Sequence, residues 1–213
     1  NLLRHLRQGT PLEPGIWRRD ASGAVVDGGP FATSHDLDTL PRIDRELTRW
    51  RLYSVHNGNY RRTPGTYIMA GRDCWHGRCT FCSWTTLFPT YRVRSPEKVA
   101  DEVGELIERH GVREIMDDTG CFPRGEWLRE FCRLMIERGY NRRVHFDCNM
   151  RFGALGPEDY ALMRKAGFRF VLFGLESACQ ETLDRLRKNL KAEQIAEGAR
   201  AAAEAGLEVH VTV

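Results

Sequence analysis

From Tyr67 onward, short apolar runs alternate with segments in which apolar residues recur every three or four positions. The apolar runs predict five strands, at residues 67–70, 112–116, 144–148, 168–175 and 207–213. The segments between them predict amphipathic helices, at residues 95–111, 127–139, 157–167, 180–188 and 192–205. Ser95 and Pro96 begin the first of these helices and Gly111 ends it. Such alternation is typical of a parallel sheet covered by helices, so we expect an α/β domain over residues 67–213.

Residues 1–66 follow a different pattern, with several prolines and turn clusters such as Asp27-Gly-Gly-Pro30. Residues 2–8 resemble the end of a helix, and residues 16–20 and 24–27 predict a small hairpin around Ser22-Gly23. We therefore read residues 1–66 as a linker or extension. The chain begins with Asn1 and ends inside an apolar run, so we expect it to be a fragment of a longer protein.

Composition limits the possible classes of protein. The 213 residues are 41% hydrophobic, and 32 basic and 29 acidic residues leave a net charge of +3. This mixed surface does not favour nucleic acid as a partner, and no apolar stretch has the length of a membrane span. Seven cysteines, an odd number, favour a reducing cytoplasm over a disulfide framework. We expect the paired arginines 61–62 and 142–143 to lie on solvated faces.

Three cysteines are concentrated in one ten-residue stretch, residues 73–82. Cys74, Cys79 and Cys82 form a Cys-x4-Cys-x2-Cys array, which is typical of soft-metal ligands. A structural zinc site needs four ligands, and His76 is a candidate for the fourth. Three cysteines on a four-iron cluster instead leave one iron open. The other four cysteines are scattered, and we expect them to be buried in the core: Cys121, Cys132, Cys148 and Cys179.

Polar residues follow the predicted strands at the ends where parallel α/β folds place their working groups. Asp117 and Asp118 follow the second strand, Asn149 and Arg151 the third, and Glu176 and Ser177 the fourth. The three cysteines follow the first strand. One edge of the sheet is therefore predicted to carry the site.

At residues 73–82 the sequence resembles the radical S-adenosylmethionine (SAM) superfamily, whose usual triad is Cys-x3-Cys-x-aromatic-Cys, with Phe81 as the aromatic residue. The first gap is one residue longer here, a form similar to that of the cobalamin-binding branch of the superfamily. A second stretch, Phe173-Gly-Leu-Glu-Ser177 followed by Thr182-Leu-Asp-Arg185, strengthens the resemblance. It implies a partial (β/α) TIM-like barrel of radical SAM type over residues 67–213, truncated at its fifth strand. Residues 1–66 would then follow a cobalamin-binding domain.

The resemblance also implies cofactors and roles. Cys74, Cys79 and Cys82 would bind a [4Fe-4S] cluster whose fourth iron binds SAM, and the cleavage of SAM would yield a 5′-deoxyadenosyl radical. The roles around SAM would be the ammonium for Asp117 or Asp118, the carboxylate for Arg151, the ribose for Glu176 and Ser177, the adenine for the backbone around Phe81, and a further polar contact for Asn149. Trp75, Phe81, Trp84 and Phe88 would shield the cluster. A small-molecule substrate, a flavodoxin- or ferredoxin-type electron donor and cobalamin would complete the system.

Two alternatives stay open at this point. One is a cobalamin-independent radical SAM enzyme such as a methylthiotransferase. The other is a non-catalytic module that binds zinc or an iron-sulfur cluster through the same loop. Under the leading hypothesis, Cys121 is predicted not to be a cluster ligand, although it lies at the same edge of the sheet.

Overall fold

The computed structural model describes residues 2–12, 14–30, 36–56, 60–88 and 90–213. They form two compact units, which divide between residues 35 and 36. The boundary lies earlier than the predicted one at residue 66, because residues 36–56 pack on the larger unit. Trp50 is 5% exposed and belongs to its hydrophobic core, and Arg45 pairs with Glu102 at 2.7 Å.

The smaller unit contains helix α1 (Leu2–Gln8) and a hairpin of β1 (Arg18–Arg19) and β2 (Val25–Val26). The two strands are antiparallel, as predicted. Asp20 organises the turn, because its carboxylate accepts hydrogen bonds from the backbone N–H groups of Ser22, at 2.8 Å, and Ala24, at 3.1 Å.

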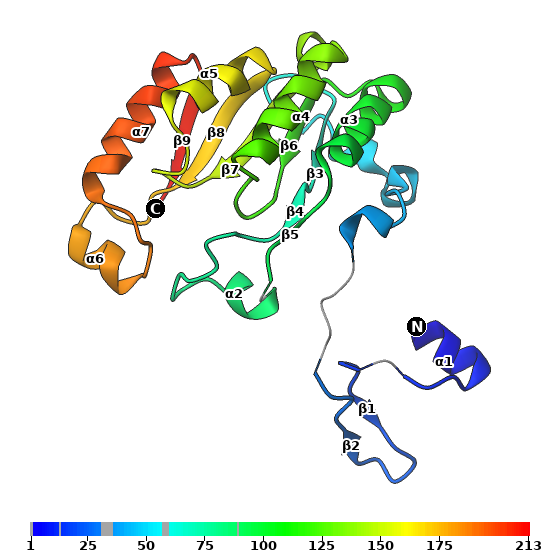
Figure 1. The fold of residues 1–213 in the computed structure, drawn as a ribbon. Coiled ribbons are helices and arrows are strands. Elements are labelled where there is room, and N and C mark those ends of the chain that lie inside the picture. Colours follow the sequence, from blue (N-terminus) through cyan, green and yellow to red (C-terminus); the bar gives the residue numbers. More distant parts are fainter. Residues whose placement is uncertain (1, 13, 31–35, 57–59, 89) are drawn as a thin grey trace. The chain divides into compact units, whose positions relative to one another are not determined.

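The larger unit is built on a parallel five-stranded sheet in the order β3-β6-β7-β8-β9 (Figure 1). The strands are β3 (Gly65–Ile68), β6 (Glu114–Asp117), β7 (His145–Met150), β8 (Phe168–Gly174) and β9 (Glu208–Thr212). All five predicted strands are present, and each is parallel to its neighbours. Since β3 and β9 form the two edges, the described strands make part of a barrel, as predicted.

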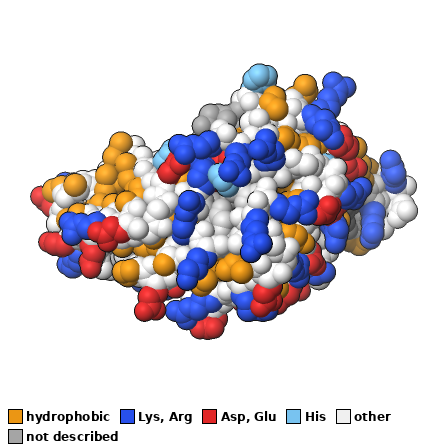
Figure 2. Space-filling view, turned by 90° about the horizontal axis from the view of Figure 1, so that it is seen from above, with side chains coloured by type: hydrophobic (Ala, Val, Ile, Leu, Met, Phe, Trp, Pro, Cys, Tyr) orange, Lys and Arg blue, Asp and Glu red, His pale blue; other side chains and the backbone are white. Residues whose placement is uncertain are grey.

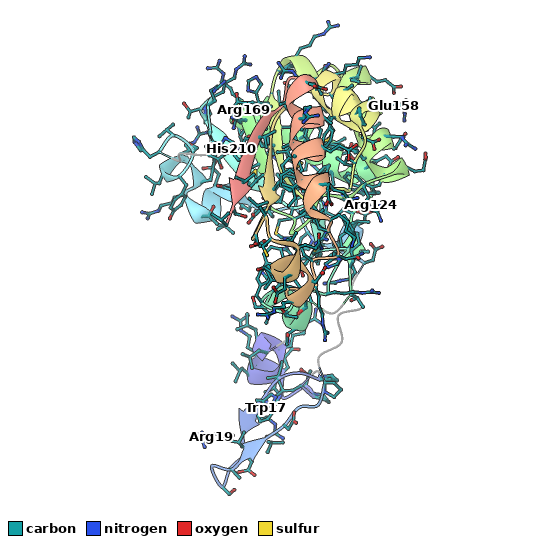
Figure 3. All side chains as sticks on the ribbon, turned by 90° about the vertical axis from the view of Figure 1, so that its left-hand side faces the viewer. Trp17, Arg19, Arg124, Glu158, Arg169 and His210 are labelled. Carbon is teal, nitrogen blue, oxygen red and sulfur yellow. The ribbon has the colours of Figure 1, made fainter. Side chains whose placement is uncertain are left out.

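Helices connect the strands and cover one side of the sheet (Figures 1 and 3). They are α3 (Pro96–His110), α4 (Glu126–Glu137), α5 (Pro157–Lys165), α6 (Gln180–Arg185) and α7 (Ala192–Glu204). The predicted signals of α3 are confirmed: the Ser95 hydroxyl accepts from the backbone N–H of Lys98, and Gly111 adopts a left-handed φ of 64°. Among the described residues, no helix has the length and apolar character needed to cross a bilayer.

Several short elements were not predicted. Residues 36–56 contain three 3₁₀ helices (Leu37–Thr39, Arg45–Thr48 and Trp50–Leu52), and another lies at Tyr140–Arg142. Beyond the first strand, β4 (Gly71–Arg72) and β5 (Arg92–Val93) form an antiparallel pair, and α2 (Trp84–Leu87) lies between them. All of these elements are too short to show a hydrophobic period. Of them, β4 and α2 flank the cysteine loop directly in the sequence.

The side of the sheet away from the helices carries a buried ion cluster, near where the strands begin. The Arg169 guanidinium lies 2.7 Å from Glu114 Oε1, 3.2 Å from Asp147 Oδ2 and 2.8 Å from Glu208 Oε2. Arg169 and His210 lie on this open side, and Glu158 lies on the helix side (Figure 3). Glu114 and Asp147 are fully buried, so one guanidinium on β8 joins three carboxyl groups that lie on β6, β7 and β9.

Figure 2 views the molecule from the end at which the strands begin, and shows many Lys and Arg side chains there. The paired arginines 61–62 and 142–143 are exposed, as predicted. Two of these arginines form ion pairs: Arg61 lies 2.5 Å from Glu208 Oε1, and Arg143 pairs with Glu108.

Candidate functional site

The cysteine loop lies beyond the C-terminal end of β3, between β4 and α2 in the sequence. Strand β5, which follows α2, pairs with β4. Cys74, Cys79 and Cys82 are half-buried free thiols. Phe81, between the second and third cysteines, is 52% exposed, whereas the side chains of Trp75, Trp84 and Phe88 are partly buried around the loop. The loop thus combines three half-buried thiols with partly buried aromatic side chains.

The thiols of this loop differ in their electrostatic environment. A hydrogen bond with Cys121 lowers the pKa of Cys74 to about 5, against the opposing effect of burial. Burial raises the pKa of Cys79, and the nearby charges of Lys188 and Arg151 partly offset that effect. Arg151 Nη1 lies 3.9 Å from Cys79 Sγ, so a guanidinium group stands beside the sulfur of the second cysteine.

A second segment holds the far side of the loop. His76 Nε2 lies 2.8 Å from the carbonyl oxygen of Arg187, and Thr80 N donates to Leu186 O at 3.1 Å. An open cavity of about 670 Å³ lies between the loop and this segment. The His76 ring is thus engaged by the connection between α6 and α7. Among the described residues, no three His, Cys, Asp or Glu side chains are gathered tightly enough to hold one metal ion.

Adjacent aspartates at the end of β6 have different environments. Asp117 is fully buried, and its carboxylate accepts from the backbone N–H groups of Ala70, at 2.6 Å, and Thr119, at 2.9 Å. Burial raises its pKa to about 7. Asp118 is exposed on the open side, where Asn149 Nδ2 lies 3.3 Å from its Oδ1. Of the two aspartates, only Asp118 is accessible to a ligand, since the Asp117 carboxylate is occupied in holding the first turn beyond β3.

Arg151 is placed by backbone and ring contacts. It is 7% exposed, it donates to the Lys188 carbonyl oxygen, and its guanidinium carbon lies 5.6 Å from the centre of the Trp75 ring. The other side of the site contributes Arg124, at 4.3 Å from the same ring centre. The indole of Trp75 thus has two guanidinium groups near it, which fixes their positions at the edge of the cysteine loop.

Glu176 has an unusual backbone. Its φ is 61°, in the left-handed region that non-glycine residues rarely adopt, and its Oε1 accepts from Lys188 Nζ at 2.8 Å. A side chain at Gly174 would lie 2.8 Å from Glu176 Oε1 and 3.0 Å from Lys188 Nζ, so glycine is needed there to leave room for the pair. Backbone strain of this kind is concentrated at functional sites.

Ser177 and Cys179 have local roles at the start of α6. The Ser177 hydroxyl accepts from the backbone N–H of Cys179 at 3.1 Å. Cys179 is exposed, so the prediction that it belongs to the core is wrong, because the residue precedes α6 at the surface. The core prediction is confirmed for Cys121, Cys132 and Cys148.

Sequence reasoning missed Lys188. Only 5% exposed, it pairs with Glu176, and its Nζ lies 5.8 Å from the centre of the Phe81 ring. It follows Arg187 and precedes Asn189, which both have positive φ values. In the sequence this stretch looks like an ordinary polar loop, and the only available signal was its position shortly after Phe173–Ser177.

The chemistry of the donor set fits an iron-sulfur cluster. Each cysteine of such a cluster binds its own iron through a thiolate, so the sulfurs need not converge on one point as they must around zinc. Buried polar atoms beside the loop support the presence of a further group. The Asp73 carboxylate, Trp75 Nε1 and the Tyr91 hydroxyl are buried and have no hydrogen-bond partner among the described residues.

A partial (β/α) barrel with a three-cysteine loop at the C-terminal edge of its sheet defines a radical SAM domain. The sequence profile of the Radical SAM superfamily matches residues 68–213, and the chain belongs to this superfamily of enzymes.

Curated proteins of this superfamily are similar to the chain in sequence. The chain is 30% identical over 198 residues to the anaerobic magnesium-protoporphyrin IX monomethyl ester cyclase of Cereibacter sphaeroides, which covers 89% of this chain and 32% of the relative. It is 26% identical over 129 residues to the hopanoid C-3 methylase of Methylococcus capsulatus, covering 60% of this chain and 24% of the relative. The chain thus spans about a third or less of these curated proteins.

Solved structures share the fold. The cobalamin-dependent S-adenosylmethionine radical enzyme OxsB matches 99% of this chain and 31% of its own, with a TM-score of 0.76 and 19% identity. The radical S-adenosylmethionine methyltransferase TsrM from Kitasatospora setae matches 99% of this chain and 42% of its own, with a TM-score of 0.69 and 18% identity.

Proposed function

We propose that the protein containing this chain is a radical SAM enzyme that binds a [4Fe-4S] cluster through Cys74, Cys79 and Cys82 and cleaves SAM reductively. When bound, the cluster supplies the electron that splits SAM into methionine and a 5′-deoxyadenosyl radical, which abstracts hydrogen from an unactivated carbon. One observation carries the proposal: the cysteine loop lies at the same sheet edge as the ion pair between half-buried Glu176 and buried Lys188, and as Arg151.

The residues around the loop would bind the parts of SAM by charge. Glu176 offers carboxylate oxygens that accept hydrogen bonds from the two ribose hydroxyls, and Lys188 beside it is a cation for the SAM carboxylate. Arg151, next to Cys79, is the second cation. Asp118 offers the accessible carboxylate for the ammonium group. Asn149 orients Asp118 through its amide, and Phe81 borders the adenine position next to Lys188.

The residues beneath the loop would exclude water from the reacting groups. Trp75 and Trp84 are partly buried, and the Trp84 ring packs against the Gly120 backbone, where a side chain would lie 2.4 Å from it. The exclusion of water limits side reactions of a radical and of the cluster.

Ser177 would contribute to ribose binding. Its hydroxyl accepts a hydrogen bond from Cys179 N, so its own proton is left to donate to a ribose oxygen.

Cobalamin enters the proposal through the solved relatives OxsB and TsrM, whose structures were determined with it. We propose that a part of the protein outside this chain carries it, and that the substrate is a small organic molecule modified at carbon. The cyclase and methylase relatives both act, by their names, on carbon skeletons. An external flavodoxin- or ferredoxin-type protein would deliver the electron in the cytoplasm.

The test uses full-length protein, purified without oxygen and reconstituted with iron and sulfide. We expect four irons per chain and, with SAM and dithionite, formation of 5′-deoxyadenosine. Cys79→Ala should abolish both the cluster and the product, because two cysteines cannot hold the cluster. Cys132→Ala is the matched control, since Cys132 is a buried cysteine of α4, and it should retain both.

One zinc per chain, unaffected by the loss of any one of the three loop cysteines, would contradict the proposal. So would a reconstituted cluster that never converts SAM to 5′-deoxyadenosine.

A further inference from the structure

One face of the cysteine loop is joined to the connection between α6 and α7. Thr80 N donates to Leu186 O at 3.1 Å, Thr80 Oγ1 lies 3.4 Å from the Arg185 carbonyl oxygen, and His76 Nε2 lies 2.8 Å from the Arg187 carbonyl oxygen. These bonds hold two segments that are distant in the sequence side by side (Figure 1). A surface that is fixed in this way needs little backbone rearrangement when a partner binds.

The open cavity between these two segments brings Cys79 and exposed positive charge together. Its lining includes Cys79 from the loop, together with Arg78 and Arg187, one from each segment. Cys79 is half-buried, whereas both arginines are exposed. We call this surface the Arg78–Arg187 face. It is a place where solvent and positive charge meet beside one of the proposed cluster ligands.

The positive charge of the Arg78–Arg187 face is not compensated. Within the described part of the chain, neither arginine forms an ion pair, because the nearby Glu181 is paired within its own helix. Asp184, which also lines the cavity, accepts a hydrogen bond from Gln180 Nε2 at 2.8 Å. The surface arginines on α4 are instead paired with glutamates of the same helix. The two arginines beside Cys79 are therefore available to a negatively charged partner.

Uncompensated surface charge of this kind favours the encounter with an acidic protein. Complementary charges steer diffusional encounter and determine its salt dependence. Complexes of electron-transfer proteins bury little surface, about 1,200 Å² or less, so steering matters for them more than contact area does. Electron transfer also slows steeply with distance, so a donor must dock beside the cluster. The Arg78–Arg187 face meets both requirements, since it carries the charge and contains Cys79.

We propose that the Arg78–Arg187 face is the docking surface for an electron-transfer protein of the flavodoxin type with an acidic surface. When this partner docks, one electron passes from its flavin hydroquinone, which becomes the semiquinone, to the oxidised cluster, which becomes the reduced cluster. This inference rests on the proposed function, because it requires a cluster bound through Cys79. It adds the surface by which the electron enters.

The experiment uses the full-length, anaerobically reconstituted protein and a purified flavodoxin in its hydroquinone form. Stopped-flow absorbance measures the second-order rate constant for reduction of the cluster in Arg78→Glu, in Arg187→Glu and in the double variant. We expect the rate constant at low ionic strength to fall about tenfold or more in the double variant and less in each single variant. Raising the ionic strength should slow the unsubstituted protein and reduce the difference between them.

Two controls separate docking from damage to the site. Arg142→Glu reverses an exposed arginine just before β7, at the other end of the strands, and should reduce at the unsubstituted rate. Excess dithionite is a small reductant that needs no docking surface. With dithionite and SAM, every variant should contain four irons per chain and form 5′-deoxyadenosine as the unsubstituted protein does.

Three outcomes would overturn the inference. The first is an unchanged rate of reduction by flavodoxin in the double variant. The second is an equal loss with dithionite, which would place the effect in the cluster site and not in docking. The third is an unsubstituted protein that flavodoxin does not reduce. Failure of the proposed function would appear differently, as an unsubstituted protein that binds no [4Fe-4S] cluster or forms no 5′-deoxyadenosine with dithionite.

Discussion

The two ends of the parallel sheet hold their charged side chains in opposite ways. Near the beginning of the strands, Arg169 pairs with Glu114, Asp147 and Glu208. At the end of the strands, the Asp73 carboxylate is buried without a hydrogen-bond partner among the described residues, and Glu176 adopts a strained backbone. A cluster in which buried charges have partners stabilises the fold. Buried polar groups without partners and strained backbones are instead typical of a site that binds a ligand.

The largest effect on stability is expected at the Arg169 cluster, near the beginning of the strands. Arg169→Met would leave Glu114 buried and uncompensated, because the guanidinium joins its carboxylate to that of Asp147. Breaking a buried ion pair in this way costs about 3–5 kcal/mol of the free energy of unfolding. Chemical denaturation of the full-length protein measures this loss, and the cluster spectrum of the folded fraction should not change.

Arg133→Met is the matched control. Arg133 is half-exposed on α4 and, within the part of the chain that the structure describes, pairs with Glu130 and Glu137 on the same helix, so its loss should cost at most about 1 kcal/mol. Equal losses in the two variants would mean that the Arg169 cluster does not stabilise the fold more than a surface pair.

The next largest effect is on SAM binding and concerns Glu176, at the end of the strands. Glu176→Gln removes the charge that would accept the ribose hydroxyls, and charge-assisted hydrogen bonds contribute roughly 1.5–3 kcal/mol, or about tenfold or more in affinity. We therefore expect SAM to bind the reconstituted variant at least about tenfold more weakly. Glutamine retains an oxygen that can accept from Lys188, so the melting temperature should fall only slightly.

Glu181→Gln serves as the control for Glu176. Glu181 lies on α6, 73% exposed at its side chain, and pairs with Arg185, so neither SAM affinity nor stability should change. Unchanged SAM affinity together with a lowered melting temperature in Glu176→Gln would assign Glu176 to the structure and not to ribose binding.

Part of this comparison could be predicted from the sequence. The five strands and the signals that begin and end α3 follow from periodicity and capping residues, because these depend on neighbouring residues alone. The choice between Asp117 and Asp118 does not follow. Strand β6 is buried at all four of its residues, so its apolar pattern does not show which side faces the helices.

Other features depend on contacts between distant residues. Lys188 is buried because Glu176, twelve positions earlier, turns back toward it. Glu114 on β6 is paired with Arg169 on β8, and β7 lies between these two strands. Neither of these pairs lies within the reach of a helical or strand period, and the sequence alone therefore could not indicate them.

The smallest effect is a pH dependence of the free energy of unfolding, caused by Asp147 in the Arg169 cluster. Burial raises the pKa of Asp147 to about 8, although Arg169 opposes it, while the carboxyl group in the unfolded chain titrates near its usual value of about 3.9. Between these values the folded state holds a proton that the unfolded state has lost. Stability should therefore fall as pH rises, by at most about 1.4 kcal/mol between pH 6 and 7.

Asp147→Asn tests this pH dependence, because asparagine can mimic the protonated acid without titrating. The unfolding free energy of the unsubstituted protein, relative to that of the variant, should decrease from pH 6 to 7. A constant or increasing difference would mean that Asp147 is ionised in the folded protein.

The central claim is that the strand ends hold a cluster with one iron left for SAM, and its most direct test is EPR of the reduced, full-length protein with and without SAM. Three cysteine ligands predict a [4Fe-4S] signal whose g values change when SAM binds. A signal that SAM does not perturb, in a protein with four irons per chain, would mean that the fourth iron is already occupied and would contradict the account.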